Sequence, residues 1–248
     1  MNDRAPARNA SAAIIGAGDY IGAAIAEKFA AEGYSVHVGR RNGDKLAPLR
    51  DRITARGGRC AAASLDARDE AQVAQFLGRA DADAPLEVCI FNVGANVAFP
   101  ILDTTERVFR KVWEMACYSG FLAGREAARL MLPRGRGSIF FTGATASVRG
   151  SSGYAAFAAA KFGLRGLAQS MARELGPSNI HVAHLVIDAG VDTAFVRERR
   201  RVALGADETP DDALMKPASI AQAYWALHTQ SRDGWTHELD LRPFGERW

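Results

Sequence analysis

The chain alternates short runs of apolar residues with longer stretches of helical length. The short runs predict strands, because each is apolar and is bounded by glycine, proline or polar residues. The seven predicted strands span residues 12–16, 35–39, 60–65, 86–92, 138–142, 180–187 and 236–241. Strands separated by helix-length segments are typical of a parallel sheet with helices on both faces.

The intervening stretches carry the periodicity of helices. In the first of them, Ile21, Ile25 and Phe29 recur at four-residue steps, so they share one helical face. The predicted helices span residues 20–33, 44–56, 70–79, 104–132 and 154–176. Together with the strands they predict the α/β class, as a doubly wound sheet of the Rossmann type.

The sequence predicts one domain. No repeat, low-complexity linker or change of composition marks a second one. We expect a short flexible tail over residues 1–11 and a single domain over residues 12–248. Within the domain, the polar segment 191–217 is expected to form a flap over a substrate, with a helical start.

Composition and charge indicate a soluble globular protein and do not favour a nucleic-acid or membrane partner. Hydrophobic residues make up 48% of the chain and charged residues 24%, which is ordinary for a globular protein. The net charge of +3 comes from 31 basic and 28 acidic residues, too balanced to favour a nucleic-acid or membrane-surface partner. No apolar run approaches the roughly 18 residues of a membrane span.

The cysteines and histidines predict neither disulfides nor a metal site. Cys60, Cys89 and Cys117 are odd in number, widely spaced and free of any Cys-x-x-Cys pair. They indicate reduced thiols in a cytoplasmic protein. The five histidines have no spacing that suggests metal ligands, so no metal is expected.

A glycine-rich turn follows the first predicted strand and opens the first predicted helix. It contains Gly16, Gly18 and Gly22, with Tyr20 and Ile21 between the last two. Glycines allow a tight turn and a close approach of the backbone, and a helix N-terminus offers free N–H groups to phosphate. A turn in this context predicts a dinucleotide-binding site.

The second predicted strand leads into Arg40 and Arg41. An acidic residue at this point would hydrogen-bond the ribose hydroxyls of NAD, whereas arginines accommodate the 2′-phosphate of NADP. Asp19 in the glycine turn argues weakly against a phosphate nearby. The pair favours NADP(H) over NAD(H), and a solvated basic turn is the alternative.

With these segments in order, the chain resembles the short-chain dehydrogenase/reductase family over nearly its whole length. Gly16 and Gly22 match the outer glycines of the family's Gly-x-x-x-Gly-x-Gly turn, and Tyr20 takes the place of the middle glycine. Asp66 resembles the acidic residue that meets the adenine. The remaining matches are Asn92-Val93-Gly94, which resembles the Asn-Ala-Gly segment of the cofactor pocket, and Asp188-Ala189-Gly190-Val191-Asp192-Thr193, which resembles the Pro-Gly-x-x-x-Thr segment beside the nicotinamide.

The resemblance also marks a departure at the catalytic positions. The family's lysine corresponds to Lys161, which the resemblance implies would hold the cofactor ribose. The tyrosine four residues earlier is Phe157, the serine is Ala144, and the asparagine of the middle helix is Cys117. Phe157 cannot donate a proton and Ala144 cannot hydrogen-bond a carbonyl, so the usual acid/base pair is missing. These three residues are expected to line the substrate pocket.

Tyr154 offers a replacement. It lies seven residues before Lys161, and three- and four-residue steps through Phe157 place all three on one helical face. This Tyr-x6-Lys spacing resembles the enoyl-acyl-carrier-protein reductase branch of the family, where the tyrosine approaches the substrate oxygen. Alternatively Tyr154 only packs at the start of the helix, and Tyr118 is a further candidate for the donor.

Two functions therefore stay open from the sequence. The first is an NAD(P)-dependent oxidoreductase that moves a hydride between nicotinamide and a carbonyl or activated C=C bond, with Lys161 and Tyr154 as catalytic residues. The second is a catalytically impaired dinucleotide-binding sensor or partner protein. The resemblance also implies a homodimer or homotetramer, paired through the long helices 104–132 and 154–176.

Overall fold

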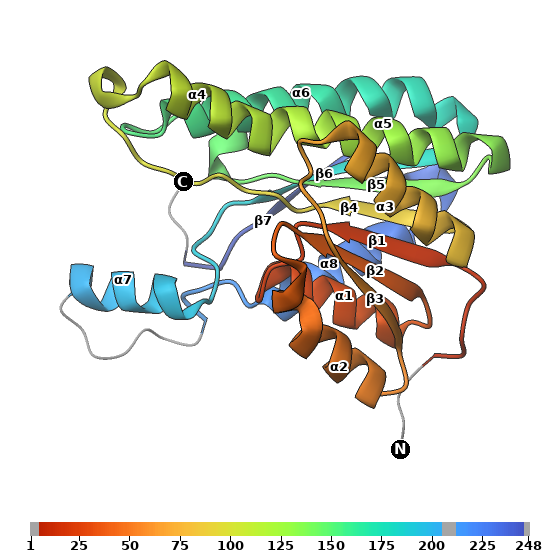
Figure 1. The fold of residues 1–248 in the computed structure, drawn as a ribbon. Coiled ribbons are helices and arrows are strands. Elements are labelled where there is room, and N and C mark those ends of the chain that lie inside the picture. Colours follow the sequence, from red (N-terminus) through yellow and green to blue (C-terminus); the bar gives the residue numbers. More distant parts are fainter. Residues whose placement is uncertain (1–4, 205–211, 246–248) are drawn as a thin grey trace.

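The computed structural model describes residues 5–204 and 212–245, and its centre is a seven-stranded parallel sheet. The strand order is β3-β2-β1-β4-β5-β6-β7 (Figure 1). The strands are β1 (Ser11–Ile15), β2 (Ser35–Arg40), β3 (Arg59–Ser64), β4 (Leu86–Phe91), β5 (Gly137–Thr142), β6 (Ile180–Ile187) and β7 (Glu238–Leu241). The predicted single doubly wound α/β domain is confirmed, and every predicted strand boundary lies within two residues of the observed one.

Helices cover both faces of the sheet (Figure 1). They are α1 (Ile21–Ala31), α2 (Ala47–Ala55), α3 (Glu70–Asp83), α4 (Glu106–Trp113), α5 (Ser119–Met131), α6 (Ala155–Leu175), α7 (Ala194–Leu204) and α8 (Pro217–His228). The apolar sides of α1, α2 and α8 share one core cluster with the sheet, and those of α3, α5 and α6 share another. None of the helices in the described residues is long and apolar enough to cross a membrane.

The predicted helix over residues 104–132 is two helices joined by a π turn. α4 ends at Trp113, the π turn spans Glu114–Tyr118, and α5 begins at Ser119. The hydroxyl of Ser119 donates to the carbonyl of Met115 within this turn. The predicted long helical run is therefore present from Glu106 to Met131, and the π turn within it was not predicted, because apolar spacing alone does not mark a single wider turn.

α8 was not predicted from the sequence. Pro217 stands at its first turn, where the missing N–H costs nothing. Its nearly continuous apolar composition gives no clear helical stripe. In the structure α8 packs on α1, and the buried hydroxyl of Tyr224 lies 2.6 Å from that of Thr142 at the end of β5.

The described part of the predicted tail is attached to the fold. The N–H of Ala5 donates to the carbonyl of Ala31, the last residue of α1, and that of Arg8 to the carbonyl of Gly33, just after the helix. Ser11, predicted as the last tail residue, is instead the first residue of β1 and is buried. The boundary between tail and domain was therefore placed too late.

The predicted flap contains the expected helical start, which is α7. Before it, Val191 pairs with Met215 in an isolated parallel bridge, and both Leu214 and Met215 are buried. Residues 205–211 of the predicted flap lie outside the described residues. The described ends of the segment are thus held against the domain.

The strand order changes direction between β1 and β4, and this defines a crevice at their carboxyl ends. The amide of Asn92, after β4, donates to the carbonyl of Gly16 at 3.0 Å. Gly16 has a φ of +87°, and a Cβ there would lie 2.6 Å from the carbonyl oxygen of Asn92. Only glycine lets the two turns approach so closely.

Candidate functional site

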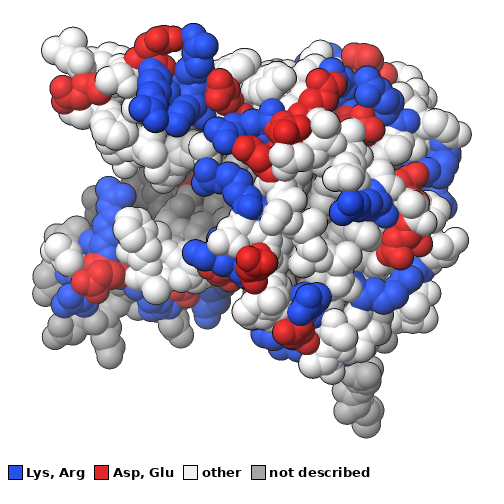
Figure 2. Space-filling view, viewed as in Figure 1, with Lys and Arg blue, Asp and Glu red and all other residues white. Residues whose placement is uncertain are grey.

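Two cavities open at this crevice, each with a volume of about 540 Å³. The first lies among the turn after β1, the ends of β5 and β6 and the start of α6. The second lies over the ends of β2 and β3. Both are bordered by Gly16, Gly18, Asn92, Val93 and Gly94. Figure 2 shows the surface hollowed between the parts formed by α4 and α7, with charges of both signs interspersed around it.

The glycine turn borders both cavities, and the start of α1 lines the first of them. α1 begins at Ile21 with no side-chain cap and no acidic residue in its first turn, so its N–H groups and dipole favour an anion. A Cβ on Gly22 would lie 2.5 Å from the Cα of Ala17, whereas one on Gly18 would meet nothing within 4 Å. Gly22 is therefore needed for packing. Tyr20 is 43% exposed and lines the first cavity.

The second cavity is rich in cations. Its basic residues are Arg40, Arg41, Lys45 and Arg68. Arg40 forms an ion pair with Asp19 at 2.8 Å, so the negative charge of this carboxylate in the glycine turn is balanced by a cation. Arg41 is exposed at the cavity edge. The two arginines singled out from the sequence do lie at one cavity, and Lys45 and Arg68 join them.

Asp66 also lies in the second cavity, as its resemblance to the adenine-binding residue implied. Arg68 holds its carboxylate with two side-chain hydrogen bonds of 2.9 and 2.6 Å. These bonds keep the pKa of Asp66 below its ordinary value. Arg68 comes from the loop after β3, where a lone arginine gave no signal in the sequence.

Lys161 is the most deeply buried cation of the first cavity, with 2% of its surface exposed. Its ammonium donates to the carbonyl of Thr142 at 2.7 Å and to that of Val93 at 3.3 Å. Burial lowers the pKa of Lys161 to about 8, because the charged form loses hydration. The nearby thiol of Cys117 acts weakly in the opposite direction.

Phe157 and Ala144 line the first cavity, whereas Cys117 lines neither cavity. The π turn directs the Cys117 sulfur to α6, where it lies 2.9 Å from the position of a Cβ on Gly163. Burial raises the pKa of this thiol, and Lys161 partly opposes the effect. The structure therefore places Cys117 in the packing between helices and not in the cavity wall.

Tyr154 also lines the first cavity and immediately precedes α6. It is half-buried, and its carbonyl accepts from the N–H of Ala158 in the first turn of the helix. The other tyrosine considered, Tyr118, stacks on Trp113 with ring centres 5.9 Å apart and lines neither cavity. Tyr154 and Lys161 thus line the same cavity.

The first residue of the predicted nicotinamide segment 188–193, which directly follows β6, lies beside this cavity. Asp188 is buried, accepts a hydrogen bond from the hydroxyl of Thr145, and lies 3.9 Å from Arg149 and 3.4 Å from Arg242. Thr145 and Arg149 line the cavity. They belong to the loop between β5 and α6, so only the fold brings them to Asp188. Val191 and Thr193 line the cavity as expected.

Across residues 5–204 and 212–245, no three His, Cys, Asp or Glu side chains are grouped so that they could hold a metal ion.

Comparison with known proteins identifies the family. Residues 10–203 match the short chain dehydrogenase family. The 3-oxoacyl-[acyl-carrier-protein] reductase MabA of Mycobacterium tuberculosis is 30% identical over 213 residues, which are 85% of this chain and 82% of that protein. The chain belongs to the short-chain dehydrogenase family.

Solved structures of short-chain dehydrogenases share the fold. One from Rhodopseudomonas palustris is 62% identical, covers 96% of this chain and 100% of its own, and has a TM-score of 0.83. A metagenomic short-chain oxidoreductase in complex with NADP is 24% identical, with a TM-score of 0.81 and coverage of 96% and 98%. Family membership makes the chain a dehydrogenase or reductase, and the matched region holds the glycine turn and Lys161.

The effect of burying Lys161 can be measured through the pH dependence of the free energy of unfolding. An exposed lysine titrates near 10.5, so between about pH 8 and that value the unfolded chain binds more protons than the folded chain. Below pH 8 the buried ammonium of Lys161 destabilises the folded chain to its full extent. This destabilisation disappears as the pH rises from about 8 to 10.5. Relative to Lys161→Met, wild-type unfolding free energy should therefore increase by on the order of 2 kcal/mol from about pH 7.5 to about pH 10.

Urea denaturation of both proteins without cofactor measures this difference. For this comparison both proteins also carry Cys117→Ala, because the pKa of this thiol depends on Lys161, and the contributions of titrating groups that do not interact with Lys161 cancel. A difference that stays constant with pH would show that the ammonium of Lys161 is hydrated in the folded chain.

Proposed function

We propose that the protein is an NADP(H)-dependent oxidoreductase that acts on a carbonyl or activated C=C bond. A nicotinamide dinucleotide, when bound, supplies or accepts the hydride. The observation that carries the proposal is the pair of cavities that meet at the glycine turn, with the uncapped start of α1 at the first of them. Lys161 lies at one end of this pair, and the arginines at the other end include Arg40.

The residues present fit such a dinucleotide. Gly16 has no side chain, so it lies close to the backbone of Asn92 and keeps the start of α1 open to a diphosphate. The N–H groups at this helix start have no side-chain partner. An ammonium has three N–H donors. Two of those on Lys161 are used by Thr142 and Val93, so the third is left for a ribose hydroxyl.

The cations of the second cavity support NADP(H) over NAD(H). Arg40 and Arg68 are each paired with one carboxylate, and Arg41 and Lys45 add two positive charges. The cavity therefore carries an excess of positive charge, which suits a phosphate monoester more than a neutral ribose diol. The metagenomic short-chain oxidoreductase of the same fold was solved in complex with NADP.

Tyr154 is the proposed proton donor. Phe157 and Ala144 face the cavity without a polar group, so a substrate oxygen finds no donor at those positions. Tyr154 borders the same cavity as Lys161, and its phenol would protonate or hydrogen-bond the developing oxyanion. The ammonium of Lys161 adds positive charge to this side of the cavity.

The substrate is proposed to be a carbonyl compound or a conjugated C=C compound. MabA is named as a reductase of 3-oxoacyl groups, which are ketones. The apolar wall of Phe157 and Ala144 also suits conjugate reduction, since hydride then goes to carbon and the enolate oxygen lies further from the wall. The proposal therefore keeps both classes.

A homodimer or homotetramer is the proposed assembly. Large apolar side chains are exposed along neighbouring helices α4, α5 and α6: Phe109, Trp113, Phe121 and Phe162. Such a patch is typical of a protein interface.

Light scattering of the purified chain should give a dimer or larger, and Phe162→Glu should shift it toward monomer. A monomeric wild type would contradict the assembly.

Cofactor choice is tested at Arg40. Wild-type protein should bind NADPH more tightly than NADH, and Arg40→Asp should reduce that preference by roughly 10- to 100-fold, because one cation is replaced by a charge of the same sign as phosphate. Titration by nucleotide fluorescence measures both affinities. Arg50→Asp is the matched control, since Arg50 is exposed on α2 and lines neither cavity. Equal affinities of wild type for the two nucleotides would refute the choice of NADP(H).

The proton donor is tested at Tyr154. Tyr154→Phe should lower turnover by roughly 100-fold or more, the usual contribution of a positioned acid, while affinity for NADPH stays within about twofold. Oxidation of NADPH by 3-oxoacyl and enoyl thioesters provides the assay. Tyr118→Phe, which removes a hydroxyl outside both cavities, should leave turnover unchanged.

Unchanged turnover in Tyr154→Phe would remove this residue from the mechanism. A wild-type protein that binds NADPH and oxidises it with no compound of either class would instead favour the alternative of a dinucleotide-binding sensor.

A further inference from the structure

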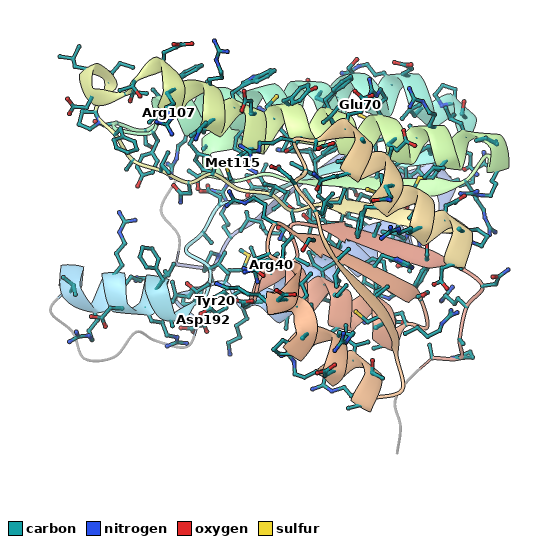
Figure 3. All side chains as sticks on the ribbon, in the orientation of Figure 1. Tyr20, Arg40, Glu70, Arg107, Met115 and Asp192 are labelled. Atoms are coloured by element: carbon teal, nitrogen blue, oxygen red, sulfur yellow. The ribbon has the colours of Figure 1, made fainter. Side chains whose placement is uncertain are left out.

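The phenol of Tyr20 joins the glycine turn to the first residue of α7. Its oxygen accepts a hydrogen bond from the backbone N–H of Ala194 at 3.3 Å. The two residues are far apart in sequence, and Figure 3 shows Tyr20 beside Asp192 at the start of the α7 segment. Neither dinucleotide binding nor proton transfer as proposed above uses this contact.

The other contacts of the α7 start come from its own segment. The hydroxyl of Thr193 accepts from the N–H of Val196 and so caps the helix. The N–H of Asp192 donates to the carbonyl of Met215 at 2.9 Å. Ala194 is the first helical residue, and its N–H has no acceptor within the helix. Tyr20 satisfies this N–H and provides a link from α7 to the glycine turn.

Tyr20 also faces the place where a diphosphate would lie. It lines the first cavity together with Gly16, Gly18 and Gly22 around the start of α1. A phenol can accept one hydrogen bond and donate another. While its oxygen accepts from Ala194, its O–H proton can be donated to an anion in the cavity, and a phosphate oxygen is a strong acceptor.

We propose that Tyr20 is a positioning residue that couples the cofactor phosphates to α7. In the free protein it holds the start of α7 against the glycine turn. With the dinucleotide bound, its hydroxyl donates to the diphosphate and still accepts from Ala194. Val191 and Thr193, which precede α7 and line the same cavity, are thereby fixed relative to the phosphates. The second half of this inference rests on the proposed function.

The link in the free protein is tested by hydrogen–deuterium exchange. Tyr20→Phe removes the acceptor, and Ala194→Pro removes the donor at the first helical position, where proline is well tolerated. Each variant should speed amide exchange over residues 195–200 by roughly fivefold, the effect of one hydrogen bond. The double variant should exchange no faster than either single variant, because both remove the same interaction.

The control for exchange is Tyr118→Phe, which loses a hydroxyl away from the cavities. Exchange in Tyr20→Phe that matches this control, or additive effects in the double variant, would overturn the link. This readout needs no cofactor and no turnover.

The contact with phosphate is tested by binding. Tyr20→Phe should weaken NADPH binding by roughly tenfold, as expected for a hydrogen bond to a charged group. Its affinity for adenosine 2′-monophosphate, which has no diphosphate, should not change. Ala194→Pro keeps the phenol and should weaken NADPH binding less than Tyr20→Phe.

The outcomes separate the two proposals. Faster exchange in Tyr20→Phe with unchanged NADPH affinity would overturn the phosphate contact and leave the proposed function intact. A wild-type protein that does not bind NADPH would overturn the proposed function and the phosphate contact together, whereas the exchange result would still decide the link to α7.

Discussion

The buried ammonium of Lys161 connects α6 with the ends of β4 and β5 at this site. Lys161 extends from α6 and donates to a carbonyl at the end of β5 and to one in the loop after β4. β4 and β5 are paired neighbours, so the sheet itself sets the two acceptors side by side. Burial still leaves the charged form at a disadvantage, as the lowered pKa shows. A third acceptor would relieve this cost, and a ribose hydroxyl is of the right kind.

The ring of Phe157 reduces the same cost. The Lys161 nitrogen lies 5.9 Å from the centre of this ring, within the range of a cation–π contact. Phenylalanine therefore keeps the aromatic surface that packs beside the ammonium and lacks only the hydroxyl. Phe157 supplies aromatic surface and no proton, so under the proposed function the donor comes from elsewhere in the cavity.

The sequence predicted the sheet well because buried strands and helix-length spacers leave a strong periodic signal. It did not predict the π turn at Glu114–Tyr118, since one extra residue per turn hardly changes apolar spacing, yet this turn directs Cys117 away from the cavity. The glycine turn and Lys161 were found because they form local motifs. Arg68 and Arg149 were missed, because single arginines reach the cavities only through the ends of strands that lie far apart in the chain.

Two phenols stand at the first cavity, and each immediately precedes a helix. Tyr20 precedes α1 and Tyr154 precedes α6, and neither side chain caps its own helix. Both helix N-termini therefore keep their positive ends at the cavity. The Tyr20 hydroxyl accepts from the N–H of Ala194 and still has its proton to donate. At α1 this field favours a diphosphate. At α6, where the charge of Lys161 is added, it favours negative charge on a substrate oxygen beside Tyr154. Under the proposed function, the same arrangement of a phenol ahead of an uncapped helix would face a permanent anion at α1, the diphosphate, and a transient one at α6, the substrate oxyanion.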